Sequence, residues 1–195
     1  MPTKRGHGTQ RTWCGPRTFV LLLAVLFAAP AIAANDDDDD ELPDYRPGLV
    51  ATYQATGGKP IVRRDVDVQF VWRDASPDPR IHPGPLKARW QGRLFTMSPG
   101  KYQLHVYAQG KVRLRIAGKT CFDQTLEKPK WITSESLTLD YGYHPLELDF
   151  EKTGSEARIG LYWSGPQFQL EPLTERNLVH EPAHAPDESF ERGRL

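Results

Sequence analysis

One segment of the sequence has the spacing of a zinc-protease site, formed by His180, Glu181 and His184. In the H-E-x-x-H motif, two histidines four residues apart bind zinc from one face of a regular helix, and the glutamate acts as a general base. Here Pro182 lies inside the motif and Pro186 follows it, and proline breaks a helix. We therefore predict that the protein is not an enzyme, and a small metalloprotease is the least favoured of three functional hypotheses.

No other catalytic pattern stands out in the sequence. It contains no G-x-S-x-G elbow, no P-loop and no C-x-x-C-H haem-attachment motif. The carboxylates of Glu147 and Asp149 alternate with apolar residues, which is typical of the solvent face of a strand. The sequence thus offers no catalytic residue.

Five residues near predicted loops could bind a ligand: Tyr107, Gln109, Trp131, Tyr141 and Tyr143. Sugar rings stack on exposed aromatic side chains, and amides form hydrogen bonds with hydroxyl groups. The alternative is that these aromatic residues fill the core, as most do in a small β-domain. Polar neighbours favour a surface position most for Tyr107 and Trp131. We take all five as candidate ligand-binding residues.

Residues 1–34 have the parts of a cleavable signal peptide. Residues 1–17 carry four basic and no acidic side chains, and residues 18–29 form an unbroken apolar run. A proline and a small-x-small sequence follow, which favours cleavage after Ala33 or Ala34. The apolar run is shorter than the roughly 20 residues needed to cross a bilayer. We predict export to the periplasm or the outside of the cell, with no membrane span after cleavage.

Removal of the signal peptide changes the charge and the cysteine content. The chain has 25 basic and 25 acidic residues, and residues 1–34 hold four of the basic ones and no acid, which leaves a net charge of −4. This balance argues against nucleic-acid binding, which needs clustered basic surface. Cys14 is lost with the signal peptide, so Cys121 has no partner for an internal disulfide. We interpret Cys121 as a buried, inert thiol, with intermolecular pairing or a reactive role as the alternative.

Two polar segments flank a single predicted domain at residues 48–173. Residues 35–47 begin with a run of adjacent acids that repel one another, which predicts a disordered linker. Residues 174–195 combine prolines, histidines and mixed charges, and they predict a disordered tail.

The domain between these segments shows the period of β-strands. Apolar residues alternate with polar ones in several runs, among them 66–72, 102–106, 112–116, 146–150 and 159–163. Turn residues separate the runs, and the spacing of eight to twelve residues favours an all-β antiparallel sandwich or barrel. Gln109-Gly110 is interpreted as a hairpin turn. Gly92 and Gly100 are expected where the backbone turns or approaches another segment closely, and Trp90 and Trp163 in the core.

Four stretches in this order resemble the PA14 family, named for the protective antigen of anthrax toxin. They are residues 48–53 (GLVATY), 88–94 with 98–102 (ARWQGRL and SPGKY), 112–119 (VRLRIAGK), and 143–150 with 157–163 (YHPLELDF and ARIGLYW). The resemblance spans residues 48–173 and implies a PA14-type β-sandwich or barrel. The chain resembles a stand-alone, exported member of this family.

The resemblance implies a non-enzymatic module that binds polysaccharide or another component of the cell envelope. The alternative is a structural or protein-interaction subunit of an envelope complex. Adhesins of the family hold calcium with two adjacent aspartates, and the metal then binds sugar hydroxyls. The matching positions here are Ala108 and Gln109, which offer one neutral amide oxygen between them. We therefore predict no metal and no cofactor, and sugar binding without the adhesin-type calcium site.

Overall fold

The computed structural model describes residues 44–73 and 76–184 of the chain. The predicted signal peptide, most of the predicted acidic linker and the last eleven residues lie outside the described residues. Within the described part, no helix has the length and apolar character needed to cross a membrane.

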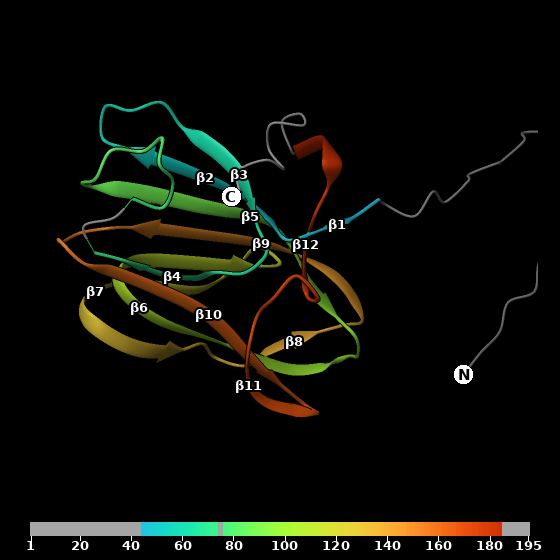
Figure 1. The fold of residues 1–195 in the computed structure, drawn as a ribbon. Helices are drawn as coiled ribbons and strands as arrows, with labels where there is room; N and C mark the ends of the chain where they lie inside the picture. Colours follow the sequence, from blue (N-terminus) through green and yellow to red (C-terminus); the bar gives the residue numbers. More distant parts are fainter. Residues whose placement is uncertain (1–43, 74–75, 185–195) are drawn as a thin grey trace, which may run out of the picture. The chain divides into compact units, whose positions relative to one another are not determined.

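Twelve strands and one short 3-10 helix, η1, make up the described residues (Figure 1). In chain order they are β1 (Arg46–Pro47), β2 (Leu49–Ala55), β3 (Ile61–Asp65), β4 (Gln69–Trp72), β5 (Leu86–Thr96), β6 (Gly100–Ile116), β7 (Lys119–Thr133), β8 (Leu137–Leu139), β9 (Gly142–Glu151), β10 (Ala157–Gly165), β11 (Phe168–Pro172), β12 (Leu178–His180) and η1 (Pro182–His184). The all-β prediction is confirmed.

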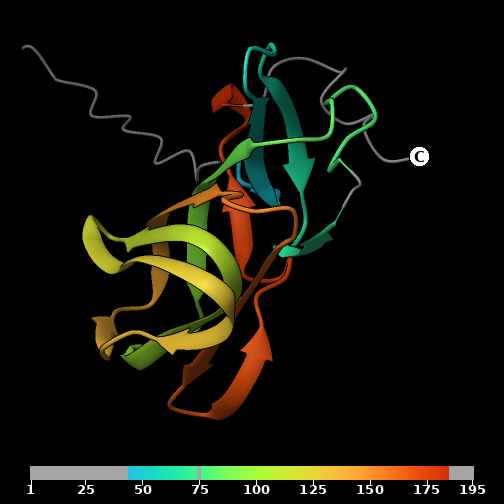
Figure 2. The ribbon, with the colours of Figure 1, turned by 90° about the vertical axis from the view of Figure 1, so that its left-hand side faces the viewer.

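The strands pair in antiparallel fashion around the long strand β6. The main order is β1-β12-β5-β9-β6-β10-β11, with β2 beside β5, β3 beside β2, β4 beside β10, and β7 and β8 beside β6. Beyond Gly110, β6 pairs with β9, and before Gly110 it pairs with β10. Strand β6 therefore belongs to both halves of the curled sheet: one half contains β5 and β9, and the other, the β10 half, contains β4 and β10. Figure 2 shows the long, curved hairpin of β6 with β7.

Gly110 is a corner inside β6, so the predicted hairpin at Gln109-Gly110 is wrong. The φ angle of Gly110 is 134°, and a Cβ atom there would lie 2.6 Å from the ring of Phe150. The strand continues through this corner to Ile116. The actual turn follows at Ala117 and Gly118, whose φ angles of 50° and 76° suit a tight hairpin between β6 and β7.

The two halves of the sheet enclose an aromatic core. Trp90 on β5 is fully buried and stacks at 6.4 Å, centroid to centroid, on Trp72 of β4, which belongs to the β10 half. Trp163 is 4% exposed and stacks at 5.5 Å on Tyr102. Both tryptophans thus occupy the core as predicted, and such rings bury a large apolar area in a domain without a disulfide.

Residues 174–184 contain β12 and η1, so the prediction of a disordered tail from residue 174 is wrong for this segment. Its strand β12 lies between β1 and β5, and Leu178 is fully buried opposite Leu94. The buried side chain and the backbone pairing outweigh the polar composition of the segment. Residues 46–47, which fell in the predicted disordered linker, form β1 against the same strand.

Candidate functional site

Three of the predicted ligand-binding residues, Tyr107, Gln109 and Trp131, lie on the solvent face of the β10 half of the sheet. Tyr107 on β6 pairs directly with Trp131 on β7, and their ring centroids are 5.2 Å apart. Tyr162 on β10 contacts Trp131 from the other side at 4.9 Å. We call these three rings the aromatic platform. Trp131 is 46% exposed, so its ring is open to a ligand.

The sequence analysis did not identify Tyr162, although the alternation of apolar and polar residues along β10 places it on the solvent face. Ile159, Leu161 and Trp163 of β10 face the core, so the residues between them must face solvent. The hydroxyl of Tyr162 donates a hydrogen bond to the amide oxygen of Gln69 at 3.0 Å. A Cβ atom at Gly160 would lie 2.9 Å from the Tyr162 ring, so this glycine lets the ring lean along the strand.

Polar side chains border the platform. His105 lies opposite Tyr162, and its ring nitrogens form hydrogen bonds with Thr133 and Ser164, each at 2.9 Å. Burial lowers the pKa of His105, which favours the neutral imidazole at pH 7. Gln109 donates from its amide nitrogen to the carbonyl of Glu127 at 3.2 Å.

Tyr141 and Tyr143 lie in a separate cluster, with Phe95 and Tyr45. The ring of Tyr143 is 4.8 Å from that of Phe95 and 4.2 Å from that of Tyr45, and Tyr141 is 5.7 Å from Phe95. Tyr141 is 68% exposed. No ring contact joins this group to the aromatic platform among the described residues, so the five predicted residues fall into two separate groups.

Ala108 and Gln109 do not fit a calcium ion. Ala108 is fully buried and faces the core, and the amide oxygen of Gln109 is covered from solvent. Calcium needs six to eight oxygen ligands, several of them charged. Across residues 44–73 and 76–184, no three histidine, cysteine, aspartate or glutamate side chains gather into a metal site.

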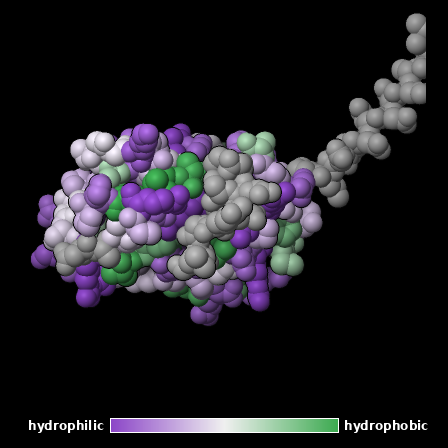
Figure 3. All heavy atoms as spheres, turned by 45° about the horizontal axis from the view of Figure 1, so that its top comes forward, coloured by the Kyte–Doolittle hydropathy of each residue, from purple (hydrophilic) through white to green (hydrophobic). Residues whose placement is uncertain are grey.

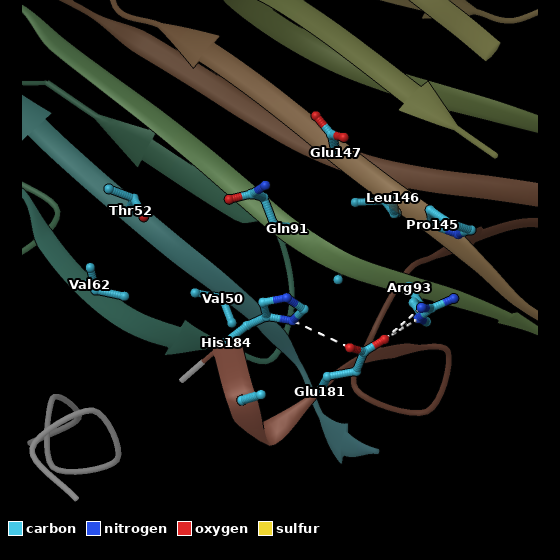
Figure 4. A pocket seen from close by; sticks show the side chains of 12 residues that line it. Val50, Thr52, Val62, Gln91, Arg93, Pro145, Leu146, Glu147, Glu181 and His184 are labelled. Carbon is cyan, nitrogen blue, oxygen red and sulfur yellow. Dashed lines mark hydrogen bonds and ion pairs between the residues drawn. The ribbon is translucent and has the colours of Figure 1, made fainter. Parts of the chain in front are cut away.

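The H-E-x-x-H segment forms one wall of a pocket of about 540 Å³ between η1, β2, β5 and β9 (Figure 4). Glu181 accepts two hydrogen bonds from Arg93, at 2.9 and 2.6 Å, and His184 points toward the same carboxylate. His180 is buried on β12, where its Nδ1 contacts the carbonyl of Gly48. The two histidines therefore belong to different elements and do not share a helix face as a zincin requires.

The lining of this pocket is mixed. Val50, Val62 and Leu146 contribute apolar surface, and Thr52 and Gln91 contribute polar groups. On the face in Figure 3, which includes β2 and β3, hydrophilic side chains likewise surround smaller hydrophobic areas. No tryptophan, tyrosine or phenylalanine lines the pocket, so the aromatic platform is the better stacking surface.

The PA14 domain model matches residues 45–173. The chain belongs to the PA14 family. The anti-sigma-I factor RsgI3 of Acetivibrio thermocellus is 26% identical over 136 residues, which are 67% of this chain and 21% of that protein. The chain therefore spans about a fifth of the length of this relative.

Two solved structures show the same fold. An anti-sigma factor domain-containing protein from Clostridium clariflavum has a TM-score of 0.63 at 21% identity, over 72% of this chain and 50% of that chain. The PA14 sugar-binding domain of an RTX adhesin has a TM-score of 0.56 at 15% identity, over 69% of this chain and 99% of that chain. PA14 domains of this kind are generally non-catalytic binding modules.

Proposed function

We propose that this PA14 domain binds carbohydrate at the aromatic platform, without calcium and without catalysis. The observation that carries the proposal is the exposed ring of Trp131, held between Tyr107 and Tyr162 on the solvent face of the sheet. The exposed part of a tryptophan ring gains hydrophobic stabilisation when a ligand covers it. A pyranose ring presents a flat apolar face of suitable size. The adhesin relative described as sugar-binding supports this ligand class.

The predicted signal peptide at residues 1–34 supports export as part of the same proposal. An exported module with exposed aromatic rings meets polysaccharides of the envelope or the surroundings. Edman sequencing of the protein recovered from the cell exterior or the periplasm should begin at Ala34 or Asn35. Recovery of the intact N-terminus in the cytosol would contradict export.

A glycan array with the purified protein tests the binding function directly. We expect retention of at least one polysaccharide class, equal in calcium and in EDTA, and loss of that retention in Trp131→Ala. Tyr141→Ala is the matched control, because this exposed ring belongs to the other cluster. Failure of the wild-type protein to bind any glycan would reject the proposal.

A second candidate is a protein-interaction subunit of an envelope complex, and the cluster of Tyr45, Phe95, Tyr141 and Tyr143 favours it. Exposed tyrosines beside a phenylalanine are typical of interface residues. Cross-linking in envelope extracts should then give an adduct that disappears in Tyr141→Ala and persists in Trp131→Ala. The opposite pattern would assign the partner to the aromatic platform instead.

A further inference from the structure

Arg158 on β10 lies on the face that carries the aromatic platform and has no polar partner among residues 44–73 and 76–184. The side chain is half-buried, its Nε atom is covered, and no hydrogen bond or ion pair reaches it from the described residues. Seven other arginines of the described residues contact a carboxylate, namely Arg63, Arg73, Arg80, Arg89, Arg93, Arg113 and Arg115. A covered guanidinium donor without an acceptor is costly, so Arg158 calls for an explanation.

The strand register places Arg158 beside the platform. It lies directly opposite Gln109 on β6 and Val71 on β4, neither of which carries a charge. The next residue on this face is Gly160, opposite Tyr107, and the following one is Tyr162. Diagonal neighbours in an antiparallel sheet are close enough for long side chains to meet, so the guanidinium and the rings can contact one ligand.

Gln109 supplies a complementary unpaired group at the same place. Its amide nitrogen is used by the carbonyl of Glu127, and its amide oxygen is covered and has no donor within the described residues. Nε of Arg158, a donor without an acceptor, and the amide oxygen of Gln109, an acceptor without a donor, thus belong to residues that lie opposite each other in the β6–β10 pair. Both atoms are covered, so a ligand would bind instead to the terminal guanidinium nitrogens of Arg158, which are not covered.

We propose that the aromatic platform selects acidic sugars, and that Arg158 binds their carboxylate or sulfate group. This inference rests on the proposed carbohydrate binding and adds the ligand class. The pyranose ring stacks on Trp131, and the terminal nitrogens of the Arg158 guanidinium donate charge-assisted hydrogen bonds to the anionic group. The net negative charge of the exported chain does not act against this, because the contact is local and salt screens distant charges.

Calorimetry with three size-matched oligosaccharides tests the proposal on the purified protein: an oligogalacturonate, a sulfated galactan and a neutral galactan. We expect at least one acidic probe to bind about tenfold more tightly than the neutral one, with an advantage that shrinks as salt increases. Arg158→Gln should remove this advantage and leave the neutral affinity unchanged. The ratio between the two acidic probes identifies the anionic group.

Arg113→Gln is the matched control, because Arg113 is a β6 arginine that already pairs with Asp123. It should retain the preference for acidic probes. The melting temperature of Arg158→Gln should be equal to or above that of the wild type, because no hydrogen bond or ion pair with the described residues is lost. Equal affinity for acidic and neutral probes, or an unchanged preference in Arg158→Gln, would overturn the inference while carbohydrate binding stands. Absence of binding to all three probes and to the glycan array would reject both.

Discussion

The indole of Trp90 donates a hydrogen bond to the buried carboxylate of Asp65 across 2.8 Å. The same carboxylate accepts hydrogen bonds from the hydroxyl of Tyr53 and from Nε of Arg63. Asp65 is 1% exposed, so this ion pair and its two neutral donors lie inside the domain. The network joins β2, β3 and β5, the strands that carry one wall of the core.

We predict that Asp65→Asn lowers the free energy of unfolding by about 3 kcal/mol, because it leaves the guanidinium of Arg63 without its nearest charge partner in a largely buried position. Urea unfolding followed by tryptophan fluorescence measures this change. Asp123→Asn is the control, since its pair with Arg113 is exposed and should contribute less than about 1 kcal/mol. Equal effects of the two substitutions would show that the buried charge is not important for stability.

We predict that the buried hydroxyl of Tyr53 makes the free energy of unfolding fall at alkaline pH. Burial, reinforced by the negative charge of Asp65, raises the pKa of Tyr53 well above its ordinary value. A raised pKa means that the folded state holds the proton more tightly than the unfolded state. This contribution is complete below about pH 10 and is lost as the pH rises from there through the higher folded pKa. Unfolding free energies measured from pH 8 to 11 should fall more steeply for the wild type than for Tyr53→Phe, and parallel curves would contradict the assignment.

Most of the core could be predicted from the sequence because its residues repeat with the period of a strand. Leu104, Val106, Leu148 and Leu161 were expected to face inward, and each is fully buried. The expected close approach at Gly92 is confirmed as well, since a Cβ atom there would lie 2.4 Å from the carbonyl of Val179. These features depend on local alternation and on backbone sterics, which a single sequence displays.

Features that depend on pairing between distant segments could not be predicted in this way. Strand β12 has only three residues within a polar segment, and its position is set by Leu94 and Arg93, more than eighty residues earlier. The platform depends on the pairing of Tyr107 with Trp131 across two register irregularities between β6 and β7. Tyr107 and Trp131 were identified by type, but only the register shows that Tyr162 and Arg158 join them.

The corner at Gly110 predicts that an alanine there destabilises the domain much more than an alanine at Gly118. In Gly110→Ala, the new Cβ atom would meet the Phe150 ring at 2.6 Å and the carbonyl of Glu151 at 2.7 Å, at a φ angle of 134°. We expect a loss of about 3 kcal/mol or more in unfolding free energy. Gly118→Ala has open space around it and should cost only about 1 kcal/mol of backbone strain. Similar losses in chemical denaturation would mean that the corner can relax.

Trp131→Ala separates ligand binding from folding. The side chain is about half exposed and lies outside the buried core, so the melting temperature should change by only about 1–3 °C. The affinity for a bound glycan should fall about tenfold or more, because the stacking surface is lost. Differential scanning fluorimetry and calorimetry on the same preparation distinguish the two effects. A large loss of melting temperature with unchanged affinity would reassign Trp131 to a structural role.

Leu178→Ala tests whether β12 is part of the domain. Leu178 is fully buried between the strands that flank β12, and truncation of such a leucine leaves a cavity that costs about 3 kcal/mol. Leu170→Ala is the matched control, because Leu170 is 49% exposed on β11 and should cost within about 0.5 kcal/mol. Urea midpoints of the two variants give the comparison directly. If Leu178→Ala were as mild as Leu170→Ala, residues 174–184 would contribute no stability, and the domain would end at residue 173 as the sequence alone predicts.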